Sequence, residues 1–144
     1  MIGIVIVAHG GLAREYLAAM EHVVGAQSGA VAISIDADHD RQSKQREICA
    51  AADAVDQGEG VVVVTDMFGG SPSNLSLLAC QPDNRRILYG MNLPMLIKLA
   101  KSRHLSVPDA VRAALEAGRK YIDSQNVKPF ATAPGADDRA TDPA

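Results

Sequence analysis

The sequence predicts an open, doubly wound α/β fold, in which a parallel sheet lies between two layers of helices. Short runs rich in Val and Ile alternate with longer segments of helical periodicity, in the order β-α-β-α-β-α-β-α-α. The runs at 2–7 and 61–65 are almost continuously apolar, which is typical of strands buried on both faces of a parallel sheet. Both runs stop at glycine-containing turns, where such a sheet turns into its helices.

The first half of the chain contains two strand–helix pairs. A strand over 2–7 is followed by a helix over 12–24, whose apolar residues form one stripe and which stops at Gly25. A second strand over 30–35 leads through a polar stretch into a helix over 41–55. This alternation requires crossover connections, so we expect the strands to be parallel.

The third strand, expected over 60–65, leads to a helix whose start is marked in the sequence. Ser71 is expected to be the N-cap and Pro72 the first helical residue, and the helix should run to residue 80. Gly-Gly-Ser-Pro therefore lies at the junction between the third strand and the third helix.

The second half continues with a short strand over 86–89 and a turn, Gly90–Pro94, that opens a helix ending at 101. Ser106 with Asp109 three residues later resembles a capping box and predicts a last helix over 107–123. A proline at 129 would restrict residues 127–130 to a short edge strand.

The strand order follows from the connections and from two side chains. His9 and Asp66 follow the first and third strands, and the carboxyl ends of parallel strands lie at one edge of the sheet. If they meet, right-handed crossovers give the strand order 2-1-3-4, with the switch point between the first and third strands. Ligands of open α/β sheets bind at such a switch point.

Bulk composition fits one domain over residues 1–130, with residues 131–144 as a disordered tail or linker stub poor in large apolar residues. The net charge of −3 argues against nucleic acid, and no apolar run approaches the roughly 20 residues of a membrane span. No secretory signal begins the chain, so we expect a cytoplasmic protein in which Cys49 and Cys80 are buried thiols.

His9 and Asp66 have the residue types of a phosphoryl relay. Neutral imidazole is nucleophilic near pH 7, and a carboxylate on the opposite ring nitrogen fixes the ring and stabilises the cation formed on attack. Backbone N–H groups of Gly10, Gly69, Gly70 and Ser71, with the Ser71 hydroxyl, would bind the phosphoryl oxygens. No P-loop accompanies them, which suits transfer between side chains without a cofactor.

Other residues carry weaker signals. Met67 and Phe68 follow Asp66 in a loop, and with Asn92 we expect them to form a rim on which a protein partner docks. His39 lies within Asp36–Asp40, but adjacent residues on an extended loop rarely converge on one ion, so no metal site is expected. His22 and His104 are expected to be solvated.

Three motifs together resemble a known family. They are Ala-His-Gly-Gly at residue 8, Val-Val-Thr-Asp-Met-Phe-Gly-Gly-Ser-Pro-Ser-Asn at residue 63 and Gly-Met-Asn-Leu-Pro-Met-Leu at residue 90. Over residues 1–125 the chain resembles the mannose-type (mannose/fructose/sorbose) enzyme IIA component of the bacterial sugar phosphotransferase system.

The resemblance implies that His9 accepts a phosphoryl group on Nε2 from the phosphohistidine carrier HPr and passes it to a IIB component. Asp66 matches the family's aspartate, which faces Nδ1, and Ser71 matches its loop serine. The family's members are homodimers that exchange a C-terminal strand, which here would fall at 127–130. Without a IIB component, the protein would report its phosphorylation state to a regulatory partner.

Three alternatives remain open. The phosphoryl-carrier subunit of a dihydroxyacetone kinase system shares the fold and the N-terminal histidine, but we expect its middle loop to resemble Asp-Leu-Gly-Ser. A small tetrapyrrole metal chelatase also begins with a strand and His-Gly, but would need further metal-facing His or Glu residues. A binding module would sense a ligand with no chemistry on His9.

Overall fold

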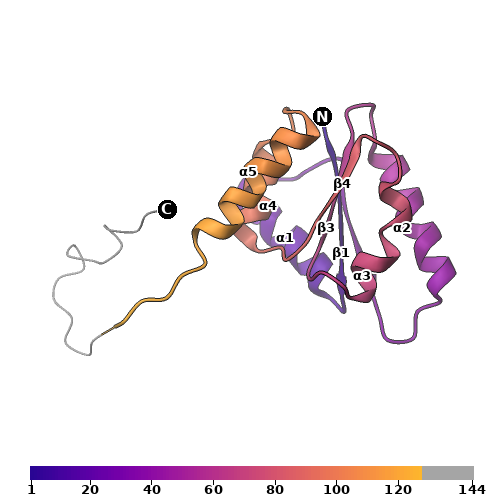
Figure 1. Cartoon of the computed structure of the whole chain (residues 1–144), viewed down its shortest axis with the longest axis horizontal. Helices are drawn as coiled ribbons and strands as arrows, with labels where there is room; N and C mark the ends of the chain where they lie inside the picture. Colours follow the sequence, from indigo (N-terminus) through magenta and orange to yellow (C-terminus); the bar gives the residue numbers. More distant parts are fainter. Residues whose placement is uncertain (128–144) are drawn as a thin grey trace.

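A computed structural model describes residues 1–127 and shows a parallel sheet between two helical layers (Figure 1). The strands are β1 (Gly3–His9), β2 (Ala30–Ile35), β3 (Val61–Thr65) and β4 (Arg85–Leu88). The helices are α1 (Leu12–Val24), α2 (Arg41–Val55), α3 (Ser71–Leu75), the 3-10 helix η1 (Leu78–Cys80), α4 (Leu93–Lys101) and α5 (Val107–Lys120). In Figure 1, α2 and α3 cover one face of the sheet, and α1, α4 and α5 cover the other.

The strand order is β2-β1-β3-β4 with all pairs parallel, as the sequence predicts. In the register, His9 lies opposite Ile35 of β2, and Val7 lies opposite Thr65 at the end of β3. Asp66 therefore follows β3 at the same edge of the sheet where His9 ends β1. This edge is the switch point, because β1 connects outward to β2 and β3 lies on its other side.

Two apolar clusters fill the spaces between the layers, and alternate residues of the central strands belong to different clusters. Ile4 and Ile6 of β1 pack with the α1, α4 and α5 side, whereas Val5 and Val7 pack with the α2 and α3 side. All four are fully buried. Since consecutive strand residues point to opposite faces, an apolar run without alternation is what a sheet covered twice requires.

The third helix differs from the expectation. Gly70, not Ser71, is its N-cap, and α3 ends at Leu75 instead of running to residue 80. Beyond α3, the backbone N–H groups of Ala79, Cys80 and Gln81 donate to the third residue back, which is 3-10 geometry. The Ser76 hydroxyl donates to the Pro72 carbonyl over 2.6 Å. Such a bond competes with the regular helical ladder and explains the break.

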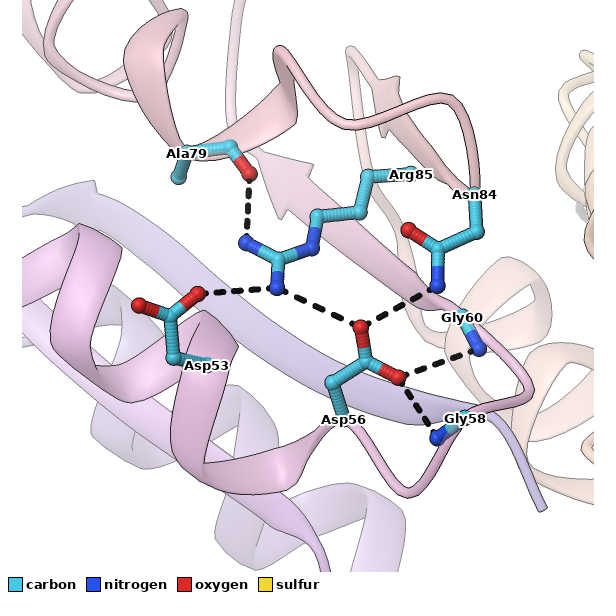
Figure 2. A network of polar contacts seen from close by, with 7 residues as sticks. All are labelled: Asp53, Asp56, Gly58, Gly60, Ala79, Asn84 and Arg85. Carbon is cyan, nitrogen blue, oxygen red and sulfur yellow. Dashed lines mark hydrogen bonds and ion pairs between the residues drawn. The ribbon is translucent and has the colours of Figure 1, made fainter.

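The edge of the sheet opposite His9 is held by a polar network centred on Arg85 (Figure 2). The guanidinium donates to the carboxylates of Asp53 (2.8 Å) and Asp56 (3.3 Å), and to the carbonyl of Ala79 (3.0 Å). Asp56 also accepts from the side chain of Asn84 over 3.1 Å. The network joins the end of α2, the loop before β3 and the start of β4.

The two cysteines, expected to be buried, are half-buried and unpaired, and both pack against the apolar cluster on the α2 and α3 side. Val127 has no regular structure, and the rest of the expected edge strand, with the expected tail at 131–144, lies outside the described residues. Within residues 1–127, no helix combines the length and the apolar character needed to cross a membrane.

Candidate functional site

His9 is the last residue of β1, at the carboxyl edge of the sheet, and its side chain is 48% exposed. The next residue, Gly10, has φ +54°, a left-handed conformation that favours glycine, and it turns the chain away toward α1. An imidazole at a strand end is fixed at its Cβ by the sheet while its far edge remains open to solvent. This is the position expected of a group that must meet a partner protein.

Asp66 holds the His9 ring. Its Oδ2 lies 2.7 Å from Nδ1 of His9 and also accepts the His9 backbone N–H over 3.0 Å. An ionised carboxylate can only accept hydrogen bonds, so Nδ1 of a neutral His9 ring carries the proton. The lone pair of the neutral ring then resides on Nε2, the nitrogen that faces away from Asp66.

The carboxylate of Asp66 is 14% exposed and its pKa is shifted. Burial by itself would raise the pKa of Asp66, but the hydrogen bonds from the His9 backbone and ring outweigh burial and hold the pKa below its ordinary value. Its second oxygen, Oδ1, is buried and has no hydrogen-bond partner among the described residues. Asp66 therefore remains a carboxylate across the neutral range, with Oδ2 directed at the ring and backbone of His9.

Gly70 borders the side of the His9 ring that carries Cε1 and Nε2. A Cβ built on Gly70 would lie 3.1 Å from Cε1 and 3.5 Å from Nε2 of His9. Gly70 has φ −85°, which any residue can adopt, so the reason for glycine here is the close approach of the ring. The loop between β3 and α3 thus passes directly beside Nε2 of His9.

The structure changes the expectation for two of the four backbone donors. The Gly10 N–H donates to the Ile35 carbonyl (3.0 Å) and the Gly69 N–H to the Ser73 hydroxyl (3.0 Å), so both are already used. The N–H groups of Gly70 and Ser71, and the Ser71 hydroxyl, have no hydrogen-bond partner within residues 1–127. Because Gly70 takes the N-cap position, the Ser71 hydroxyl is not spent on capping.

Of the three rim residues, two lie in the open. Met67 and Phe68 are exposed, and Phe68, at 76%, packs edge-on against Tyr89 with ring centroids 5.0 Å apart. Asn92 has a structural position instead: its side chain accepts the Met95 N–H at the start of α4 and donates to the Gly118 carbonyl of α5. Its amide is therefore occupied inside the α4–α5 pair.

One residue of the site was missed by the sequence reasoning. Ser73 is 3% exposed, and its hydroxyl accepts the Gly69 N–H and donates to the Gly70 carbonyl. The sequence Ser-x-Ser directly after Gly-Gly could have indicated this role, because short hydroxyl side chains form hydrogen bonds with nearby backbone groups.

The other histidines lie apart from this arrangement. His22 and His104 are exposed, and Nδ1 of His39 bonds the Asp36 carbonyl over 2.5 Å. Asp40 caps α2 by accepting the Ser43 N–H. In the part of the chain that the structure describes, no three His, Cys, Asp or Glu side chains form a group that could hold a metal.

Comparison with known proteins identifies a family and several relatives. The family model described as the fructose IIA component of the phosphotransferase system, EIIA-man, matches residues 3–116. The mannose-specific EIIAB component of Escherichia coli K12 is 29% identical over 141 residues, which are 94% of this chain and 44% of that protein. This chain thus spans less than half the length of that relative.

Two solved structures have the same fold. The phosphotransferase component EIIA from Streptococcus agalactiae superposes with a TM-score of 0.77 at 28% identity, covering 86% of this chain and 97% of that one. The mannose/sorbose-specific IIA subunit from Enterococcus faecalis gives a TM-score of 0.79 at 23% identity, covering 90% and 98% of the two chains. With a family model that spans most of its length, this chain belongs to the mannose-type enzyme IIA family of the phosphotransferase system.

Proposed function

We propose that this protein is a phosphocarrier in which Nε2 of His9 accepts a phosphoryl group from HPr and transfers it to a IIB component or reports it to a regulatory partner. The observation that carries the proposal is the 2.7 Å contact between Nδ1 of His9 and Oδ2 of Asp66 on a half-exposed ring. This contact supports the proposal, because a ring that donates its Nδ1 proton to Asp66 has its lone pair on the outer nitrogen, on the exposed side of the ring.

The transfer exchanges one P–N bond for another. The Nε2 lone pair of His9 attacks phosphorus, and the electron pair of the breaking P–N bond returns to the imidazole of the donor. The His9 ring becomes cationic, with its Nδ1 proton still donated to Asp66, and the carboxylate stabilises that charge. The reverse sequence passes the group to an acceptor, so no water and no nucleotide take part.

The open N–H groups of Gly70 and Ser71 and the Ser71 hydroxyl would then bind the phosphoryl oxygens. Donors fixed before the group arrives cost no reorganisation during transfer, which is the basis of electrostatic stabilisation of phosphoryl groups. The close approach of Gly70 to the His9 ring supports this role, since it brings the loop beside Nε2.

Exposed apolar side chains on the same loop support docking of protein partners. Met67 and Phe68 lie on the loop that carries Asp66, so a carrier that delivers phosphate to His9 would cover them. We also propose that the protein is a homodimer. The segment expected to join the two subunits is residues 127–130.

The test is transfer from phosphoenolpyruvate labelled with 32P through enzyme I and HPr. We expect an acid-labile label that is absent from His9→Ala and retained by His22→Ala, a matched control in which an exposed histidine on a helix is removed. Failure of the wild-type protein to acquire label, or labelling of His9→Ala at the wild-type level, would refute the proposal.

The acceptor is identified separately. Labelled protein is mixed with a purified mannose-type IIB domain, and loss of label to IIB indicates a part in sugar uptake. Retention of label together with altered binding of a regulatory protein indicates signalling.

A further inference from the structure

We propose that Ser73 is a positioning residue: its buried hydroxyl fixes the Gly-Gly turn so that the Ser71 N–H is presented to a phosphoryl group on His9. The inference rests on the proposed function, since it assigns a role in the same transfer. It concerns a residue that contacts neither His9 nor Asp66 through any hydrogen bond of the described chain.

Two hydrogen bonds carry the argument. The Ser73 hydroxyl accepts the Gly69 N–H over 3.0 Å and donates to the Gly70 carbonyl over 3.1 Å. Ser73 is 3% exposed, so water has little access to its hydroxyl. One hydroxyl thereby holds two consecutive glycines from inside the first turn of α3.

Peptide planarity converts these bonds into a direction for the neighbouring donor. The Gly70 carbonyl and the Ser71 N–H belong to the same trans peptide group and point in opposite directions. Because the Gly70 carbonyl points into α3, where Ser73 and the Asn74 N–H bind it, the Ser71 N–H must point out of the helix. The Ser71 N–H therefore lies at the start of α3, next to Gly70, whose backbone passes beside the His9 ring.

The turn formed by Gly69 and Gly70 is a place where the backbone would be flexible without such a restraint. Gly69 has φ +87° and Gly70 has an extended conformation, so the two glycines have different backbone conformations within one tight turn. Free glycines sample many conformations, and ordering them during transfer would add to the barrier. Within residues 1–127 the Ser71 hydroxyl makes no hydrogen bond that would restrain the turn. Ser73 restrains it in advance.

The test compares Ser73→Ala with Ser76→Ala in steady-state transfer from phospho-HPr. Ser76 is a matched control: it is fully buried and belongs to the next turn, and its hydroxyl bonds the Pro72 carbonyl without touching the glycines. We expect Ser73→Ala to lower kcat by about tenfold with KM for phospho-HPr unchanged, and Ser76→Ala to stay within about twofold of wild type. Ser73→Thr keeps the hydroxyl and should recover most of kcat.

Equal kcat values for Ser73→Ala and Ser76→Ala would overturn the inference, because a merely structural hydroxyl would then explain both. A second measurement does not depend on the folding of any variant. In wild-type protein labelled with 15N, phosphorylation should shift the amide protons of Gly70 and Ser71 downfield more than that of Gly69. The largest shift at Gly69 would also overturn it.

The two proposals fail in different ways. If the wild-type protein acquires no phosphoryl group, the proposed function is wrong. If it is phosphorylated normally while Ser73→Ala transfers like Ser76→Ala, the function stands and only the role of Ser73 is lost.

Discussion

At the scale of single residues, the contact with Asp66 determines which nitrogen of a neutral His9 ring carries the proton and which carries the lone pair. In Asp66→Asn the amide can donate to Nδ1, which moves the ring proton to Nε2 and removes the nucleophilic lone pair. We expect transfer from phospho-HPr to slow by at least about tenfold. KM should change little, because Asp66 is only 14% exposed and its Oδ2 bonds the ring and backbone of His9. Steady-state kinetics at neutral pH measure this, and an unchanged kcat would reject the role of Asp66.

The two glycines of the loop give a second prediction, because they require glycine for different reasons. An added Cβ on Gly70 would press on the His9 ring at 3.1 Å, whereas a Cβ on Gly69 would meet nothing within 4 Å but would sit at φ +87°. Gly70→Ala should therefore lower kcat by about tenfold or more while leaving the melting temperature nearly unchanged. Gly69→Ala should lose about 1 kcal/mol of stability with a smaller effect on kcat.

Thermal unfolding and steady-state kinetics of the two variants separate these effects. If Gly70→Ala keeps wild-type kcat, the ring can move away at no cost, and the contact between Gly70 and His9 has no part in transfer.

At the scale of elements, the loop between β3 and α3 presents an aromatic ring that the fold does not use for its core. Phe68 is 76% exposed and forms a T-shaped contact with the ring of Tyr89. A side chain so placed contributes little to stability but can bury its ring against a partner. We expect Phe68→Ala to raise KM for phospho-HPr by about tenfold, at unchanged kcat and melting temperature.

Val23 on α1 offers a matched control, because it is also an exposed apolar residue but lies near the opposite end of that helix from His9. Val23→Ala should leave KM unchanged. A KM for Phe68→Ala equal to that of wild type would remove Phe68 from the docking surface.

The network at the opposite edge of the sheet makes stability depend on pH. Hydrogen bonds, first that from the Gly58 N–H, hold the pKa of Asp56 below its ordinary value, although burial opposes them; Asn84 and Arg85 add to the effect. A folded-state pKa below the unfolded value of about 4 means that this stabilisation is present above pH 4 and is lost as the pH falls through the folded-state value. Denaturant unfolding between about pH 6 and pH 3 should show it.

Asp56→Asn should be about 1–2 kcal/mol less stable at pH 7, and its stability should fall less steeply on acidification. The control is Asp38→Asn, in which the replaced carboxylate is exposed and has no hydrogen-bond partner within the described chain. Parallel pH profiles for wild type and Asp56→Asn would show that Asp56 does not couple folding to protons.

The third helix shows where sequence patterns stop predicting elements. The spans of α1, α2 and β2 follow directly from apolar periodicity and end signals, because burial decides them. Over 71–80 the pattern predicts one helix, yet serine hydroxyls at 73 and 76 bond nearby carbonyls and divide it. Such competition depends on side-chain rotamers, which periodicity does not contain.

At the scale of the whole molecule, the fold explains why part of the site could be predicted. Strand order 2-1-3-4 follows from right-handed crossovers and from one required meeting of His9 and Asp66, so topology and site were inferred together. The directions of the backbone N–H groups could not be predicted. The Gly10 N–H donates to the Ile35 carbonyl and the Gly69 N–H donates to the Ser73 hydroxyl, so neither is open to a ligand. The sequence shows which residue carries a backbone N–H, but the orientation of the peptide group decides whether that N–H already has a hydrogen-bond partner.

The reactivity of the two cysteine thiols can be used to test whether the whole domain unfolds cooperatively. Burial, with smaller effects from neighbouring charges, raises the pKa of the Cys80 thiol to about 11 and also raises that of Cys49. A pKa of 11 leaves only about 0.03% thiolate at pH 7.5, and the thiolate is the reacting form. We therefore expect both thiols of the native protein to react with a disulfide reagent far more slowly than in the unfolded chain.

Cys49 lies on α2 and Cys80 at the end of η1, so the two thiols sample different elements of one apolar cluster. If the domain unfolds as one unit, both should become reactive together, at a rate that rises with denaturant as global unfolding does. Mass spectrometry of the modified thiols over a guanidinium chloride series measures this. Modification of Cys80 well before Cys49 would mean that η1 opens locally, and that the segment beyond α3 moves independently of the sheet carrying His9.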